Sequence, residues 1–125
     1  MEHFIAVVDD DISVRKSLGR LIRSVRLEVR TFASAEEFLN SADLRKPDCL
    51  ILDVHLPGMS GIELYYHLHA HKSTVPVIFI TAHPSDDLAR LQAASDGAVA
   101  YFTKPFSGDE LLDAVNAALK RTPGG

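Results

Sequence analysis

Hydrophobic residues along this chain occur in two alternating patterns, as short continuous runs and as repeats at helical spacing. The continuous runs predict buried β-strands. They cover residues 4–8, 27–32, 49–53, 75–81 and 98–103. Glu28 and Arg30 make the second run less apolar than the others, and Pro76 lies near the start of the fourth, where proline is tolerated.

Between the runs, apolar positions recur every three to four residues, as they do on one face of an α-helix. The five helical stretches begin near Asp11, Ser34, Ser60, Pro84 and Ser107. A Ser followed three residues later by Glu, as at Ser34 and Ser60, is a capping box that marks a helix start. The stretch at 84–95 has only modest apolar content.

The resulting order is a strand followed by a helix, five times over. Nearly continuous apolar strands separated by helices predict a parallel sheet covered on both faces. Right-handed crossovers then give an open, doubly wound α/β sandwich, in which function lies beyond the carboxyl ends of the strands. A chain of 125 residues is expected to form one domain. We place that domain at residues 1–121, followed by a linker-like tail at 122–125.

Composition argues against several classes of protein. The net charge of −4 speaks against direct nucleic-acid binding by this segment, which would need a basic surface. No apolar stretch approaches the roughly 20 residues that span a bilayer, and the N-terminus lacks the features of a secretion signal. Cys49 is the single cysteine, so we expect a small buried residue in a reducing compartment. We therefore expect a cytoplasmic protein with no membrane association.

Polar residues follow four of the predicted strands, at the ends that a parallel sheet would bring together. Asp9 and Asp10 follow the first strand, Asp53 ends the third, Thr81 ends the fourth and Lys104 follows the fifth. Two carboxylates about 5 Å apart repel by roughly 3 kcal/mol at an effective dielectric constant near 20, and three repel more. A bound Mg²⁺ is the simplest way to offset this repulsion because it prefers oxygen ligands, and Mn²⁺ is its closest substitute.

These residues form a complete set for phosphoryl transfer to Asp53. A carboxylate beside Mg²⁺ can act as a nucleophile toward phosphorus and form an acyl phosphate. Lys104 can neutralise one phosphoryl oxygen, and the Thr81 hydroxyl can donate a hydrogen bond to another. Each residue also has a simpler interpretation: the two N-terminal acids as helix caps, Asp53 as a turn residue, Thr81 as a structural residue and Lys104 as a solvated lysine. Their joint occurrence at one sheet edge favours the chemical interpretation.

Four short motifs carry a resemblance to a known family. They are VDDD at 8–11, LDVHLPGMSG at 52–61, ITA at 80–82 and KPF at 104–106. In this order and spacing they are similar to the motifs of receiver domains of bacterial two-component response regulators. The resemblance covers Ile5 to about Leu119. The stretch VRKSL, just after the first motif, further resembles the nitrogen-fixation regulator subfamily, whose members usually carry a C-terminal helix-turn-helix.

The resemblance implies a flavodoxin-like (βα)5 sandwich with strand order 2-1-3-4-5 and a signalling switch that accepts a phosphoryl group. Asp53 would be phosphorylated by a partner histidine kinase. Asp9, Asp10 and Asp53 would hold Mg²⁺ together with the backbone carbonyl of His55. The protein would not be an enzyme in the usual sense, although it would catalyse its own phosphorylation and dephosphorylation.

The resemblance also implies how the signal would leave the site. Thr81 and Lys104 would contact the phosphoryl group, and Tyr101 would turn inward when Thr81 moves. The change would reach the face made by the fourth helix, the fifth strand and the fifth helix, which receivers use for homodimers or other partners. The peptide bond between Lys104 and Pro105 is expected to be cis, which proline makes less costly.

Two other functions are compatible with part of the pattern. The alternative is a Mg²⁺-dependent phosphatase or phosphotransferase with an aspartyl-phosphate intermediate. Haloacid-dehalogenase-like enzymes carry a second acid two residues after the nucleophile, and here that position is His55. A flavin or nucleotide carrier would need a glycine-rich phosphate loop after the first strand, where the acids at 9–11 would instead repel phosphate.

Histidines are the remaining residues with chemical potential. His55 and His83 each lie two residues after a predicted site residue. They either modulate phosphoryl hydrolysis and metal access by titrating near neutrality, or are exposed loop residues. His67 and His71 share one helix face at a spacing that can bind zinc. No cysteine or third ligand accompanies them in the sequence, so we expect a solvated helix face.

Overall fold

Five parallel strands form one sheet in the order β2-β1-β3-β4-β5 in the computed structural model of the chain. The model describes residues 4–41, 46–71, 73–82 and 98–121. The strands are β1 (Phe4–Val8), β2 (Glu28–Phe32), β3 (Cys49–Asp53), β4 (Val77–Thr81) and β5 (Ala98–Thr103). The predicted fold class and strand order are therefore confirmed. β2 starts one residue later than expected and β4 two residues later.

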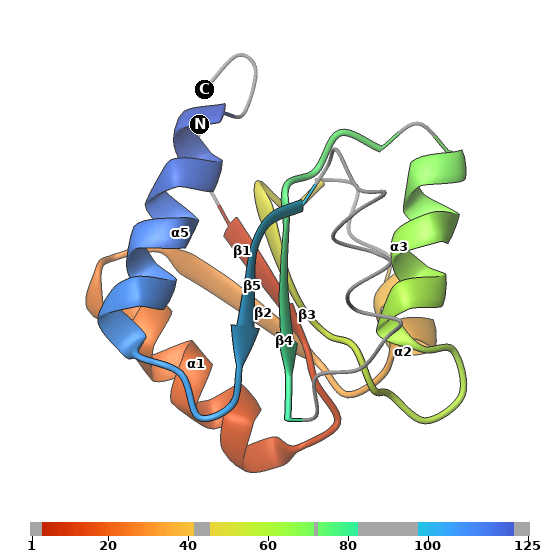
Figure 1. Cartoon of the computed structure of the whole chain (residues 1–125), viewed down its shortest axis with the longest axis horizontal. Coiled ribbons are helices and arrows are strands. Elements are labelled where there is room, and N and C mark those ends of the chain that lie inside the picture. The colour runs from red at the N-terminus through yellow and green to blue at the C-terminus, as the bar shows by residue number, and fades with distance from the viewer. Residues whose placement is uncertain (1–3, 42–45, 72, 83–97, 122–125) are drawn as a thin grey trace.

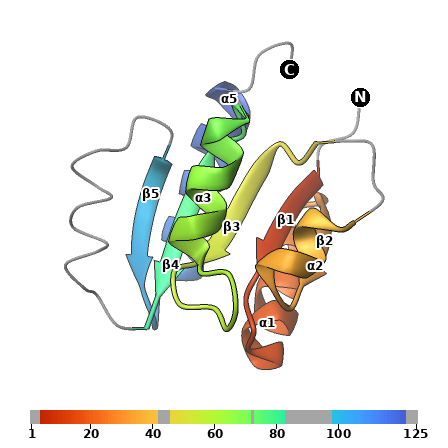
Figure 2. The same ribbon diagram turned by 90° about the vertical axis from the view of Figure 1, so that its right-hand side faces the viewer.

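Helices cover both faces of the sheet (Figures 1 and 2). They are α1 (Ile12–Ser24), α2 (Ala35–Leu39), α3 (Gly61–Ala70) and α5 (Gly108–Arg121). In Figure 1, α1 and α5 lie on one side of the sheet, and α2 and α3 lie on the other. The helix expected at 84–95 lies outside the described residues. None of the described helices is both long enough and apolar enough to cross a bilayer.

The two faces of the sheet carry two separate hydrophobic cores. Successive residues of a strand point to opposite faces, so neighbouring side chains of one strand belong to different cores. Ile5 and Val7 of β1 belong to the core beneath α1 and α5, together with Leu18 and Leu111. Ala6 and Val8 of the same strand belong to the core beneath α2 and α3. Every residue of β1 and β3 is buried, which explains why these strands have continuous apolar sequences.

Side-chain caps begin the helices at the predicted places. Asp11 caps α1 by accepting a hydrogen bond from the backbone N–H of Ser13. Ser60 and Glu63 form the expected reciprocal capping box at the start of α3. At α2, Ser34 accepts from the N–H of Glu37, but the Glu37 carboxylate accepts from Ala33 instead of from the cap residue. With these caps, α1 and α2 each start within a few residues of a strand end.

Candidate functional site

The register of the central strands brings Asp9 and Asp53 next to each other. β1 pairs with β3 through Val8 and Leu52, so the residues that follow these two lie side by side at the carboxyl edge of the sheet. Asp9, Asp10 and Asp53 each offer a carboxylate oxygen, and these oxygens lie within 4.8 Å of one another. Asp9 is fully buried and Asp53 is 4% exposed, whereas Asp10 is exposed. The expected convergence of the three acids is therefore confirmed.

Lys104 completes the cluster from the far end of the chain. Its ammonium donates to Asp9 Oδ2 at 2.8 Å and to Asp53 Oδ2 at 3.1 Å. The backbone N–H of Lys104 also donates to the carbonyl of Thr81 at 2.8 Å, which fixes the segment after β5 against the end of β4. The peptide bond between Lys104 and Pro105 is cis, as expected. One ammonium thus bridges two buried carboxylates that come from different strands.

Backbone groups orient both carboxylates. Asp9 Oδ1 accepts from the N–H of Asp11 at 2.9 Å, and Asp53 Oδ1 accepts from the N–H of His55 at 3.0 Å. Arg15 of α1 donates to the backbone carbonyl of Asp9 at 2.7 Å. Sequence reasoning missed this role of Arg15, because it depends on how the first turn of α1 lies against the end of β1. Each acid therefore keeps one oxygen on a backbone donor and turns the other toward Lys104.

Burial and charge shift the proton equilibria of this cluster. Burial raises the pKa of Asp53, and the nearby charge of Asp9 raises it further. The His55 N–H and the Lys104 ammonium act in the opposite direction without cancelling the rise. Burial alone would lower the pKa of Lys104, but its hydrogen bonds and charge interactions with the two acids outweigh burial, so that pKa is raised. Lys104 thus favours the charged form of Asp53 against burial and the charge of Asp9, and the two acids favour the charged form of Lys104.

The donor set of this edge suits a hard divalent cation. Three carboxylates gather there, and Lys104 supplies one opposing charge by direct contact. A net negative cluster of carboxylate oxygens at the rim of a sheet matches the oxygen ligands that Mg²⁺ and Mn²⁺ take. Asp10 is exposed, so the cluster is open to solvent on one side. The residues present therefore fit Mg²⁺.

Thr81 and Tyr101 share one face of the sheet. Phe79 pairs with Tyr101, and Thr81 pairs with Thr103, so all four side chains alternate onto the same side. Thr81 is fully buried. The half-buried ring of Tyr101 stacks on Phe79 with centroids 5.6 Å apart, and Tyr65 of α3 packs edge-on against Phe79 at 5.4 Å. A row of three aromatic rings thus runs from α3 across β4 to β5.

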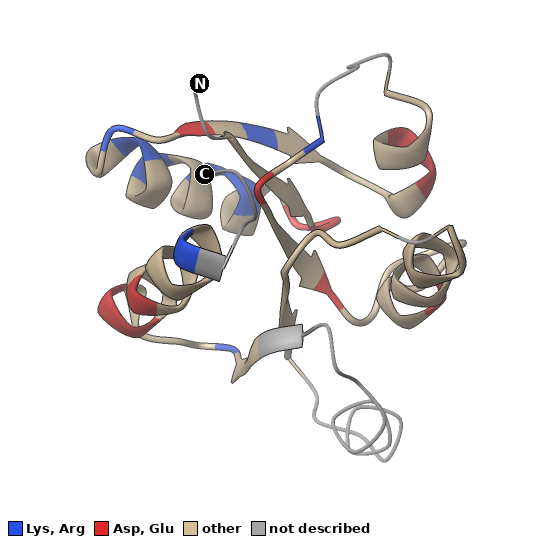
Figure 3. Ribbon diagram, turned by 90° about the horizontal axis from the view of Figure 1, so that it is seen from above, with Lys and Arg blue, Asp and Glu red and all other residues tan. Residues whose placement is uncertain are grey.

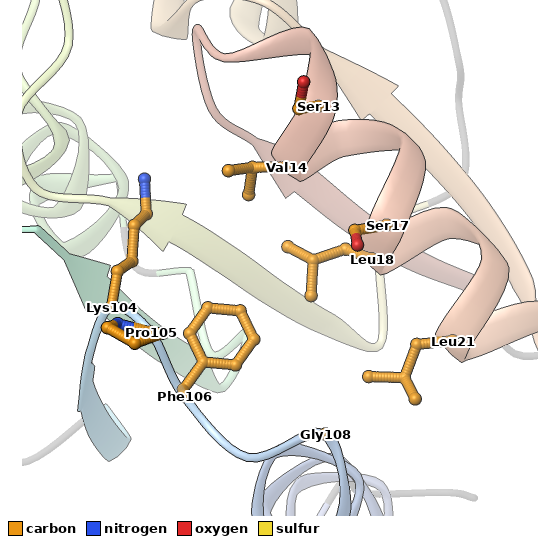
Figure 4. Close-up of a pocket in the computed structure, with 9 residues that line it drawn as sticks. All are labelled: Ser13, Val14, Ser17, Leu18, Leu21, Lys104, Pro105, Phe106 and Gly108. Carbon is orange, nitrogen blue, oxygen red and sulfur yellow. The ribbon is translucent and has the colours of Figure 1, made fainter.

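A groove of about 580 Å³ lies between α1 and the segment that joins β5 to α5 (Figure 4). Val14, Leu18 and Leu21 line it from α1, and Phe106 lines it from the opposite wall. Lys104, whose ammonium contacts Asp53, is also one of the residues that line the groove. The sequence did not predict this groove, because its two walls are distant in the chain.

Charged residues are distributed unequally between α1 and α5, the two helices beside the groove (Figure 3). Lys16, Arg20 and Arg23 are exposed along α1. Asp109 and Glu110 form the acidic first turn of α5. None of these five charged residues lines the groove itself, whose described lining is mainly apolar.

Other residues singled out in the sequence lie in several settings. The side chain of His55 is exposed, and His83 lies outside the described residues. Cys49 is buried as expected, and its burial raises the pKa of the thiol to about 12. Tyr65 is buried in the core, whereas Tyr66 is exposed. A thiol with this pKa remains protonated at neutral pH, so Cys49 is not a nucleophile or a metal ligand here.

Known proteins are similar in sequence to this chain over most of its length. Residues 5–116 match the family model described as the response regulator receiver domain. The chain is 48% identical to Nodulation protein W of Bradyrhizobium diazoefficiens, with 94% of this chain and 51% of that protein covered. It is 44% identical to the response regulator protein TodT of Pseudomonas putida, with 95% and 52% covered. The chain therefore spans about half the length of these two relatives.

Solved structures agree with the sequence comparison. A CheY-like response regulator receiver domain protein from Methanospirillum hungatei superimposes with a TM-score of 0.87 at 27% identity, with 98% of this chain and 97% of that chain covered. The family match covers most of the chain, and the fold and the acidic edge agree with it. The chain thus belongs to the response regulator receiver domain family, whose members are phosphoryl-accepting signalling switches.

Proposed function

We propose that Asp53 is the phosphoryl acceptor of this receiver and that a partner histidine kinase supplies the phosphoryl group. The observation that carries the proposal is the contact of Lys104 with both Asp53 and Asp9 at the open, acidic edge of the sheet. An Asp53 carboxylate oxygen attacks phosphorus, the bond from phosphorus to the histidine nitrogen of the donor breaks, and the imidazole leaves. The product is a mixed anhydride on Asp53.

The neighbouring residues prepare Asp53 for this step. The His55 N–H and the Lys104 ammonium stabilise the ionised carboxylate, which is the nucleophilic form. Lys104 is then in place to contact a phosphoryl oxygen, with Asp9 as its second partner. Asp9, Asp10, Asp53 and the backbone carbonyl of His55 would hold Mg²⁺ or Mn²⁺. A bound Mg²⁺ supplies neutralisation of phosphoryl charge.

Thr81 and Tyr101 are the proposed relay. Thr81 lies at the end of β4, and Tyr101 is stacked on Phe79 two residues earlier on the same face. The Thr81 hydroxyl would donate a hydrogen bond to a phosphoryl oxygen, which favours one position of the Thr81 side chain. That position in turn favours one orientation of the Tyr101 ring. Phosphorylation then shifts a pre-existing equilibrium toward a form that exposes a homodimer or partner surface around β5, α5 and the helix expected at 84–95.

The groove beside Lys104 is the proposed docking surface of the phosphodonor. Its lining is mainly apolar, exposed basic residues lie nearby on α1, and Lys104, whose ammonium contacts Asp53, is part of its lining. A partner helix seated there would hold its phosphohistidine at the acidic edge.

The chain is proposed to act in the cytoplasm as the regulatory half of a longer transcription regulator. The two relatives above are about twice its length, and other relatives are DNA-binding or transcriptional regulatory proteins. Residues 1–121 would form the receiver, and 122–125 would begin a linker to an output domain.

The decisive experiment is incubation with acetyl phosphate and Mg²⁺, followed by intact mass measurement. We expect wild type to gain one phosphoryl group and Asp53→Asn to gain none. Asp113→Asn, an exposed carboxylate of α5, is the matched control and should be labelled like wild type. Labelling of Asp53→Asn to the wild-type extent would refute the assignment.

The same mixture distinguishes a switch from a phosphatase. A switch accumulates one label per chain and consumes donor only as fast as that label is lost. A phosphatase with an aspartyl-phosphate intermediate would release inorganic phosphate from a range of small phosphate esters in many turnovers. Steady turnover of such esters that disappears in Asp53→Asn would favour the enzyme.

A further inference from the structure

The C-terminal end of α3 carries two histidine rings in direct contact. His67 and His71 are one helical turn apart, and their ring centroids lie 4.4 Å from each other with the ring planes tilted by 31°. Both residues are exposed, so nothing in the described part of the chain covers the pair. Residues four apart lie on the same face of a helix, which explains why the rings meet.

A backbone hydrogen bond fixes the tautomer of one ring. His71 Nδ1 lies 2.8 Å from the backbone carbonyl of His67. A carbonyl can only accept a hydrogen bond, so the proton of the neutral ring is on Nδ1 and the lone pair is on Nε2. Metal-binding histidines in proteins are commonly oriented in this way, with the second ring nitrogen bonded to a carbonyl. His71 is therefore prepared to donate a lone pair to a metal.

The position of the pair at the C-terminal end of α3 favours a bound cation electrostatically. His71 is the C-terminal cap of α3, where the carbonyls of the last turn give the helix end partial negative charge. In Figure 1 this end of α3 lies at the edge of the sheet opposite the one where β4 and β5 end. A cation bound there is remote from Asp53, and the two sites can be tested separately.

We propose that His67 and His71 form a binding site for one borderline transition-metal dication, with Zn²⁺ as the representative ion. Imidazole nitrogens suit Zn²⁺, Ni²⁺ and Cu²⁺, whereas Mg²⁺ prefers oxygen ligands. Two imidazoles supply half of a tetrahedral shell, and water fills the remaining positions. The sequence alone indicated a solvated helix face, and the structure adds two observations that favour a metal site there: the contact of the two rings and the hydrogen bond of His71 Nδ1.

His69 provides a matched control on the same helix. It lies between the two proposed ligands in sequence, but its ring stacks on Tyr65 with centroids 6.0 Å apart and planes 20° from parallel. It is exposed like the other two histidines. Replacing it removes one imidazole from the chain without touching the pair.

The test is calorimetric titration of the untagged chain with Zn²⁺ in saturating Mg²⁺, which engages the acidic edge. We expect one Zn²⁺ per chain in wild type, and weakening by at least about tenfold in His67→Ala and in His71→Ala, since even the loss of an outer-shell partner costs that much. His69→Ala and Asp10→Asn should bind Zn²⁺ like wild type. Equal Zn²⁺ binding by the His67→Ala/His71→Ala double variant, or a comparable loss in His69→Ala, would overturn the site.

A spectroscopic readout separates ligation from a change in folding. Cu²⁺ bound by wild type should show nitrogen hyperfine coupling from two imidazoles in electron paramagnetic resonance, and each single variant should lose one nitrogen. All three positions are exposed, so the far-ultraviolet circular dichroism of the variants should match wild type. Unchanged nitrogen coupling in both single variants would contradict the proposal.

Discussion

Gly61 lies so close to the backbone carbonyl of Asp53 that a methyl group added to its α-carbon would overlap that oxygen. The contact joins the first residue of α3 to the last residue of β3. The N–H of Gly61 also donates to the carbonyl of Val54 at 3.0 Å. A glycine is therefore required here by close approach, and it sets the path of the chain around the acidic edge.

Gly61→Ala is expected to destabilise the protein by about 1–3 kcal/mol, because the opposing atom belongs to the backbone and cannot move aside. Gly19→Ala in α1 is the contrasting control. A methyl group there would meet only the tip of the flexible Arg23 side chain, so replacement of a mid-helix glycine should stabilise by up to about 1 kcal/mol. Urea unfolding of both variants checks the prediction, and equal shifts of the same sign would contradict it.

Asp53→Asn is expected to stabilise the metal-free protein at neutral pH. The folded pKa of Asp53 is raised above its ordinary value of 3.8, so the folded chain binds this proton more tightly than the unfolded chain does. Wild-type stability then falls as pH rises from 3.8 to the raised pKa, and asparagine escapes this loss. The benefit arises first from the burial of the carboxylate and then from the charge of Asp9, neither of which penalises a neutral amide in this way.

Urea unfolding with a chelator across an acid-to-neutral pH series measures this effect. The two proteins should be similar in stability at the acid end and should diverge as pH rises. Asp113→Asn controls for the loss of one negative charge on the surface. Parallel curves for wild type and Asp53→Asn over the whole series would show that Asp53 does not titrate as described.

Lys104→Met is expected to raise the affinity for Mg²⁺. The ammonium bonds to Asp9 and Asp53 and competes with a cation for the same carboxylates. Its removal should tighten Mg²⁺ binding by about tenfold, or about 1.4 kcal/mol, and should destabilise the metal-free protein. Titration calorimetry measures the affinity, and Lys120→Met on α5 is the control. Weaker binding in Lys104→Met would mean that Lys104 organises the ligands instead of competing for them.

Thr81→Ala is expected to separate phosphorylation from its consequence. The acceptor carboxylate is untouched, so acetyl phosphate should label the variant, while the ring of Tyr101 should no longer respond to the label. The lost hydroxyl should cost about 1 kcal/mol of stability. Nuclear magnetic resonance of the Tyr101 ring before and after labelling gives the readout. Thr81→Ser should retain the response of the Tyr101 ring. Thr103→Ala should retain it too, because Thr103 is exposed and only pairs with Thr81 in register. A full response in Thr81→Ala would exclude the relay.

Glu36→Ala is expected to loosen the turn between β3 and α3. The Glu36 carboxylate accepts from the backbone N–H of Met59 at 2.9 Å, next to Gly58 with its φ of 73°. This hydrogen bond lowers the pKa of Glu36 below 4.5, so its stabilisation is present above 4.5 and is lost as pH falls through the lowered pKa. Hydrogen exchange of the Met59 amide should accelerate in Glu36→Ala more than in Glu36→Gln, and Glu110→Ala should leave it unchanged.

Local sequence was sufficient for the architecture. The bounds of β1, β3 and β5 follow from continuous apolar runs, because strands covered on both faces have no polar side to interrupt them. Asp11 and Ser60 marked helix starts, because a cap bonds within its own turn. β4 was predicted to start two residues early, because Val75 and Pro76 are apolar without belonging to the strand.

The detailed contacts of the acidic edge could not be predicted from local sequence, because they join segments that are distant in the chain. The carboxylates could be assigned to one edge from the strand order, but the bridging position of Lys104, the donation by Arg15 to Asp9 and the clamp from Glu36 to Met59 could not. The groove beside α1 likewise has walls that are distant in the chain. The His67 and His71 pair is local, because its spacing already places both residues on one helix face, and only the contact of the rings needed the structure. Local pattern specifies which face of an element is buried. Packing angles and rotamers decide which polar atoms come within bonding distance.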